Sequence, residues 1–216
     1  MNLQLEAMAL AMPDVAGHPN RLPFRGVLTL VGVASQGAPH GARGHRVMLT
    51  RSATDAALPS LLGMALDYAP SLDSHDVRRK IGIITEANIV PFHPALSPRD
   101  GDNHPSERKD GARRGPRSGG APAGRTESLR AVGQLAVSGY LFAHDFPDLV
   151  DEIRAQASGP DSTLGMSYEM TSVEVPNQKA SIWTATAFTF TGAAVLRRDK
   201  AAYPQTWIAL ESPAGK

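Results

Sequence analysis

Residues 164–170 read LGMSYEM and place one serine among residues that commonly fill β-strands. Side chains alternate between the two faces of a strand, so Ser167 and Glu169 share one face if this stretch is extended. Gly165 has no side chain, which lets another backbone come close to that face. The stretch therefore predicts a strand over 164–175 with a hydroxyl and a carboxylate on one side. A solvated pair on an ordinary strand is the simpler interpretation of the same spacing.

The composition limits the function classes. The chain of 216 residues has 22 Lys and Arg against 21 Asp and Glu, so no net field favours nucleic acid or an anionic membrane as a partner. Cysteine is absent, which excludes disulfides, thiolate metal sites and a cysteine nucleophile, and suits an intracellular protein. No run of about 18 apolar residues occurs, so we expect no membrane-spanning segment.

Changes in composition along the chain predict one domain with loose segments. Residues 1–23 are rich in Pro and Gly after a short apolar start, and we expect a flexible arm there. Residues 93–128 contain almost no large apolar side chain and cannot offset the entropy of ordering, so we expect a disordered insertion. The domain itself is expected over 24–204, and residues 205–216 are expected to form a C-terminal tail.

The elements of the domain follow from runs of β-branched residues and from helical spacing. Strands are predicted over 26–34, 45–50, 80–90, 132–142 and 181–195. One helix is predicted after Thr54 or Asp55, with Leu58, Leu61, Leu62 and Ala65 on one face. Others are predicted after Asp145, with Leu149, Val150 and Ile153 on one face, and briefly within 197–203. The predicted strands and helices do not alternate as they do in βαβ units. Their order along the chain therefore indicates an α+β protein built on an antiparallel β-sheet or barrel with two or three flanking helices.

A serine becomes a nucleophile when a base removes its proton, and histidine is the usual base near neutral pH. His75 stands just before the predicted strand at 80–90, beside Asp73 and Asp76, where a rigid scaffold can present it. A surface histidine near acidic residues is the alternative interpretation. Metal-ligand spacings, a phosphate-binding loop and the G-x-S-x-G pattern are absent from the sequence, so we expect neither a metal nor a cofactor.

Taken together, these segments resemble the phage prohead (capsid maturation) proteases, which are related in fold to the herpesvirus assemblin proteases. The resemblance covers residues 24–204 apart from 93–128. It lies in the order of the segments along the chain, which is His, strand, helix, Gly-x-Ser, strand. The segments that carry it are LPSLLGM, His75 followed by IGIITEANI, LAVSGYLF, FPDLVDEIRA, LGMSYEM, and FTFTGAAVL followed by RRDKAAY.

The resemblance implies a serine endopeptidase with a herpesvirus-protease-like fold, Ser167 as the nucleophile and His75 as the general base. The third member is open, because relatives carry it on the strand after the serine strand, where this chain has no carboxylate or imidazole near Thr191. We expect Glu169 in that role because it shares a strand face with Ser167. Asp73, Asp76 and Thr191 are the alternatives for the third member.

The resemblance further implies that the substrates are scaffold and major capsid proteins, cut inside the procapsid in the cytoplasm of the bacterial host. It also implies a homo-oligomer, and it makes Arg197-Arg198 analogous to an arginine pair near the oxyanion site of assemblins. Because the insertion is rich in Pro and Gly and unpaired, we expect it to be a preferred cutting site, with self-cleavage there or in the N-terminal arm. An inactive protease-fold scaffold or assembly factor of the phage head is the second interpretation, and a small-molecule β-barrel binder is the third.

Overall fold

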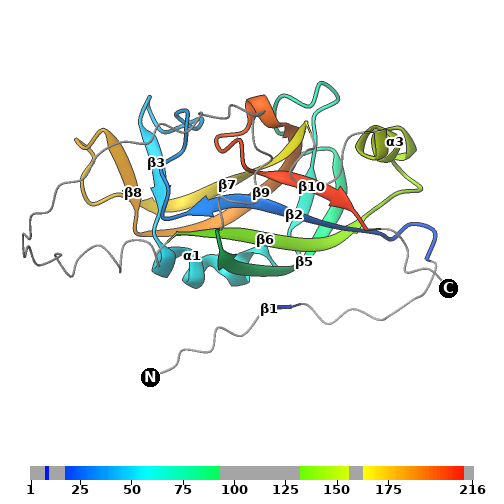
Figure 1. The fold of residues 1–216 in the computed structure, drawn as a ribbon, viewed down its shortest axis with the longest axis horizontal. Coiled ribbons are helices and arrows are strands. Elements are labelled where there is room, and N and C mark those ends of the chain that lie inside the picture. The colour runs from blue at the N-terminus through cyan, green and yellow to red at the C-terminus, as the bar shows by residue number, and fades with distance from the viewer. Residues whose placement is uncertain (1–7, 10–17, 93–131, 156–162, 212–216) are drawn as a thin grey trace, which may run out of the picture.

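The computed structural model describes residues 8–9, 18–92, 132–155 and 163–211 (Figure 1). They form an α+β fold in which a mixed β-sheet curls into a half-barrel, with helices α1 (Arg51–Ala57) and α3 (Pro147–Ala155) beside it. The α+β class is therefore confirmed, while the insertion expected over 93–128 lies outside the described residues. Among the described residues, no helix is both long enough and apolar enough to cross a membrane.

The main sheet has the strand order β10-β2-β6-β5-β4-β9-β7, and β1 pairs with β5 beside this path. Its strands are β1 (Met8–Ala9), β2 (Leu22–Val31), β4 (Ala65–Asp67), β5 (Lys80–Pro91), β6 (Gly133–Leu141), β7 (Leu164–Glu174), β9 (Ala187–Arg197) and β10 (Trp207–Leu210). All of its pairs are antiparallel except β4 with β9.

A second, two-stranded sheet pairs β3 (Arg46–Leu49) with β8 (Ile182–Ala185), and these strands are also parallel. The expectation of a purely antiparallel sheet is thus wrong at two pairs. In both, the partners are far apart in the sequence. No tight hairpin joins them, so the chain is not forced to run back antiparallel.

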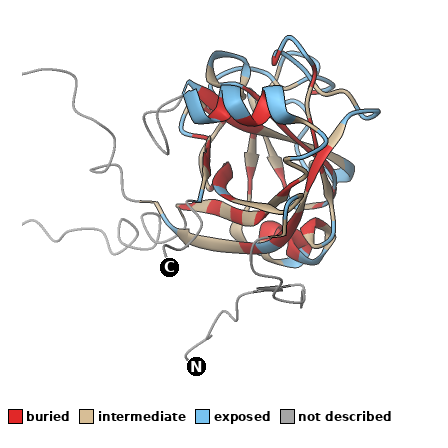
Figure 2. Cartoon of the chain, turned by 90° about the vertical axis from the view of Figure 1, so that its right-hand side faces the viewer, coloured by how far each residue is buried: buried red, intermediate tan, exposed pale blue. Residues whose placement is uncertain are grey.

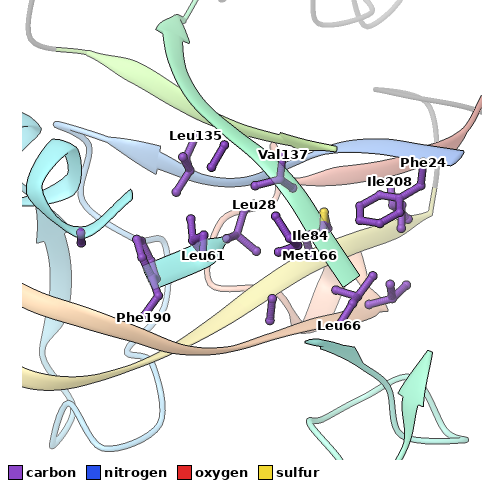
Figure 3. Close-up of a cluster of buried hydrophobic side chains, with 14 of the residues drawn as sticks. Phe24, Leu28, Leu61, Leu66, Ile84, Leu135, Val137, Met166, Phe190 and Ile208 are labelled. Atoms are coloured by element: carbon purple, nitrogen blue, oxygen red, sulfur yellow. The ribbon is translucent and has the colours of Figure 1, made fainter. Parts of the chain in front are cut away.

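The hydrophobic core lies inside the curve of the sheet (Figure 3). Strand β6 alternates buried and partly buried residues along its whole length, as expected for a strand with one face on the core. The labelled core side chains are Phe24, Leu28, Leu61, Leu66, Ile84, Leu135, Val137, Met166, Phe190 and Ile208. The faces of the strands that point away from this core, here called the outer face, are therefore where polar side chains can gather.

The expectation that Ala65 lies on a helix is wrong, because Ala65 begins strand β4. Helix α1 ends at Ala57, and it also begins earlier than the sequence indicates. Its N-cap is Thr50, whose hydroxyl oxygen accepts a hydrogen bond from the backbone N–H of Ala53 at 3.3 Å. Thr54 is buried within the helix and donates back to the Thr50 carbonyl, while Asp55 forms an ion pair with Arg51. The prediction that Thr54 or Asp55 caps the helix is wrong, because both have partners inside it. A 3-10 turn, η1 (Leu58–Leu61), continues the chain at Pro59.

Helix α3 matches its prediction, since Leu149, Val150 and Ile153 are the residues it buries. The short helix expected within 197–203 is a single 3-10 turn, η4 (Arg198–Lys200).

The long strand expected over 181–195 is two strands. The chain breaks at Thr186, whose backbone N–H donates to the Glu174 carbonyl at 2.9 Å, and it passes there from β8 in the small sheet to β9 in the main sheet. The C-terminal tail expected over 205–216 contains β10, which pairs with β2 and buries Ile208. The N-terminal arm likewise contributes β1 and the first two residues of β2 to the sheet.

Candidate active site

Four neighbouring strands align Lys80, Asp67, Ala194 and Ser167 in one row across the outer face. The register pairs Asp67 with Lys80 on one side and with Ala194 on the other, and it pairs Ala194 with Ser167. Cross-strand partners share a face, and strands are about 4.8 Å apart, so Asp67 and Ser167 lie about 10 Å apart at the backbone. Between them Ala194 contributes only a methyl group.

The loop between β4 and β5 brings His75 to this row. Its Leu72 side chain is buried in the core, and the Leu72 carbonyl accepts a hydrogen bond from the backbone N–H of Arg197 at 2.7 Å. Closer to the histidine, the backbone N–H of Asp76 donates to Asp67 Oδ1 at 3.3 Å. The loop is thus tied to β9 and β4 on either side of His75.

The imidazole of His75 lies between two carboxylates. Its Nδ1 is 3.4 Å from Asp67 Oδ1 and 3.9 Å from Glu169 Oε1. The side chain is 17% exposed, and both ring nitrogens are shielded from solvent. Neither nitrogen has a hydrogen-bond partner among the residues that the structure describes. Because a buried polar group is costly without a partner, this ring is the least satisfied polar group of the row.

Asp67 is the residue that sequence reasoning missed. Its side chain has 0% exposure, its Oδ1 accepts the Asp76 N–H, and its Oδ2 is 3.4 Å from the Lys80 ammonium. The local signal was weak, because Asp67 follows Leu66 in a three-residue strand that reads like the end of a helical pattern. Only the register of β4 with β5 and β9 brings its carboxylate to Lys80 and His75.

Glu169 reaches toward His75 across a glycine. A Cβ at Gly192, the cross-strand partner of Glu169, would lie 2.7 Å from Glu169 Oε2, so the missing side chain leaves the space that the carboxylate occupies. The Glu169 side chain is 44% exposed, and its 3.9 Å separation from Nδ1 is longer than a hydrogen bond. The structure therefore brings Glu169 and His75 together without bonding them.

Ser167 lies on the outer face of β7, between the buried core residue Met166 and Tyr168, which packs against the core. His75 Nε2 has no hydrogen-bond partner among the described residues, so the Ser167 hydroxyl and the imidazole are not hydrogen bonded. Gly165 meets another part of the chain, as expected: a Cβ there would be 2.7 Å from Thr206 Oγ1 and 3.2 Å from the Arg198 Cα.

The alternative acids, Asp73 and Asp76, form their hydrogen bonds and ion pairs with residues other than His75. Asp73 accepts hydrogen bonds from the hydroxyls of Ser71 and Ser74, which lower the pKa of its carboxyl. The backbone N–H of Arg78 lowers the pKa of Asp76, whose carboxylate also pairs with the Arg78 and Arg79 side chains.

Thr191 and the Arg197-Arg198 pair lie near the row without contributing donors or acids to it. Thr191 is exposed and sits at a register shift between β9 and β7. In the Arg197-Arg198 pair, the two backbone N–H groups donate to the carbonyls of Leu72 and Thr163, so both are already engaged.

Nucleophilic catalysis by serine uses a hydroxyl, an imidazole and one carboxylate. This face holds the hydroxyl and the imidazole together with two carboxylates, Asp67 and Glu169, of which one would suffice. No cluster of three or more side chains suited to a metal ion occurs in the described part of the chain. Comparison of the chain with protein-family models, with curated proteins and with solved structures finds no match.

Proposed function

We propose that this protein is a serine endopeptidase of the prohead-protease type, which cuts scaffold and major capsid proteins during maturation of a phage head. The observation that carries the proposal is the position of His75, shielded beside Asp67 on the same sheet face as Ser167. Formation of homo-oligomers, cleavage of the protein's own arm or insertion, and action within the procapsid in the host cytoplasm are parts of the same proposal.

In the proposed reaction, the Ser167 hydroxyl attacks the carbonyl carbon of a substrate peptide bond while His75 takes its proton. The same imidazole then returns the proton to the leaving amine, and water hydrolyses the acyl-enzyme. Backbone N–H groups stabilise the negative oxygen of the intermediate. Catalytic hydrogen bonds are often long without substrate and tighten when it binds, so an unbonded Ser167 in the free protein agrees with this mechanism.

The test of the proposal is the Ser167→Ala variant, co-expressed with the phage's scaffold and capsid proteins. We expect it to fold and to lose all processing, because its methyl group cannot attack a carbonyl. Product masses of substrates and of the protein itself give the measurement. Thr171→Ala, an exposed change on the same strand, is the control and should cleave normally. Processing by Ser167→Ala at the wild-type level would exclude Ser167 as the nucleophile.

The second candidate function is an inactive protease-fold scaffold or assembly factor of the phage head. It is favoured by the absence of a hydrogen bond at either ring nitrogen of His75 among the described residues. A fluorophosphonate probe separates the two functions, because it reacts with an activated serine. Labelling of Ser167 supports the protease, whereas a folded wild-type protein that stays unlabelled supports the assembly factor.

A further inference from the structure

We infer that Asp67, held by Lys80, is the positioning residue that orients His75, and that Glu169 does not have this role. The inference rests on the proposed function, since an oriented imidazole matters for catalysis only if His75 is the base. The third member of the site is then Asp67 on β4, across β9 from Ser167, and not Glu169, which lies two residues from Ser167 on β7.

The two carboxylates differ in solvent exposure. Both carboxylates approach the same nitrogen, Nδ1, but Asp67 is 0% exposed at 3.4 Å and Glu169 is 44% exposed at 3.9 Å. Water screens an exposed ion pair until it contributes little, whereas a buried pair keeps its attraction. The Asp67 carboxylate therefore has the stronger influence on the ring.

Asp67 is also held more rigidly than Glu169. The Asp76 N–H and the Lys80 ammonium hold the two oxygens of Asp67, and β4 lies inside the sheet between β5 and β9. Lys80 also supplies the opposite charge that a buried carboxylate requires. Glu169 has a longer side chain on β7, which ends the sheet order. A residue that orients a base must itself be fixed, and Asp67 meets this condition better.

The consequence concerns the tautomer of His75. A carboxylate beside Nδ1 favours the form in which Nδ1 carries the proton and donates it toward Asp67. In that form Nε2 has a lone pair, which is what a general base needs to accept the Ser167 proton. Loss of the Asp67 charge would permit the other tautomer, in which Nε2 carries a proton and cannot act as the base.

The tautomer can be measured in the intact protein without any substrate. In ¹⁵N-labelled protein at mildly alkaline pH, long-range ¹H–¹⁵N correlations distinguish the two tautomers of each histidine, and a His75→Gln variant assigns the signal. We expect wild type to show Nδ1–H, Asp67→Asn to shift toward Nε2–H, and Glu169→Gln to match wild type. An Nε2–H tautomer in wild type would overturn the inference, and this spectrum needs no variant at Asp67.

The rate of fluorophosphonate labelling gives the second readout. We expect Asp67→Asn to slow it by at least about 100-fold, while Glu169→Gln stays within about fivefold of wild type. A labelling rate that falls as far in Glu169→Gln as in Asp67→Asn would overturn the inference that Glu169 does not orient the ring. If wild type does not label at all, the protease proposal fails, yet the tautomer spectra still decide which carboxylate orients the ring.

Discussion

At the scale of single residues, Gly165 connects the serine strand to the C-terminal part of the chain. The Thr206 hydroxyl that fills its space accepts a hydrogen bond from the Met166 N–H at 3.2 Å and donates to the Tyr203 carbonyl at 2.9 Å. Turning that hydroxyl away would break both bonds. The Arg198 Cα on the other side is backbone and cannot move separately. A side chain at position 165 would therefore clash with Thr206 and with the backbone at Arg198.

We expect Gly165→Ala to lower the free energy of unfolding by about 1–3 kcal/mol, as overpacking of a filled site does. Urea denaturation followed by circular dichroism measures the change. Gly37→Ala is the matched control, because a Cβ there meets nothing within 4 Å, and it should change stability by less than about 1 kcal/mol. Equal stability of the two variants would mean that the turn at Thr206 yields more readily than its two hydrogen bonds suggest.

Sequence reasoning could select Ser167, His75 and Glu169 but not Asp67, and the reason is physical. Alternation along one strand is local, so it places Glu169 on the face of Ser167 without knowledge of the fold. Asp67 reaches its position through pairing of β4 with β9, and no local pattern encodes a contact between strands so far apart in the chain. The distance of each acid from the His75 ring likewise depends on tertiary structure.

At the scale of elements, long strands with strong alternation were predictable and short ones were not. β5 and β6 carry enough apolar residues to be recognised, whereas β4 has three residues and β10 has four. Such short strands gain their stability from neighbours already in the sheet, so their own sequence carries little signal. The sequence does not reveal the break at Thr186, because β8 and β9 are both rich in β-branched and aromatic residues. The two strands nevertheless belong to different sheets.

The strand β10 makes a testable contribution, because it covers the edge of β2 and adds Ile208 to the core at 1% exposure. We expect Ile208→Ala to lower the free energy of unfolding by about 2–4 kcal/mol through lost burial and the cavity left behind. Val173→Ala, on a side chain that is 41% exposed, removes fewer buried atoms and should cost less than about 0.5 kcal/mol. Chemical denaturation of both variants gives the comparison. Similar costs would show that β10 behaves as the tail expected from the sequence.

At the scale of the whole molecule, the curl of the sheet brings β7, at one end of the strand order, alongside β2 and β10 at the other (Figure 1). Tyrosine hydroxyls lie along this seam. Tyr203 donates to the carbonyls of Val33 and Val47, which ties the segment before β10 to the chain after β2 and to strand β3. Tyr168 packs edge-on against Phe190 at 5.6 Å between ring centroids. The closed side of the half-barrel therefore depends on phenols shielded from water.

This seam should make the protein sensitive to alkali. Burial raises the pKa of Tyr168 from 10.0 to about 12, and the nearby hydroxyls of Thr29 and Tyr203 offset part of that rise. Burial, followed by the proximity of Tyr168, also raises the pKa of Tyr203. Between pH 10 and 12 the unfolded chain has lost the Tyr168 proton while the folded chain keeps it. The folded state then binds more protons, so its stability falls as the pH rises.

We expect that fall to have a slope of about 1.4 kcal/mol per pH unit for Tyr168, and Tyr168→Phe should remove this part of it. Urea denaturation between pH 9 and about pH 11.5 measures the slope, and the difference between variants cancels titrations that they share. Tyr140→Phe is the control, because it leaves both seam hydroxyls in place and should keep the wild-type slope. An identical slope in Tyr168→Phe and wild type would mean that the Tyr168 hydroxyl reaches water in the folded protein, and that the half-barrel is open along β7.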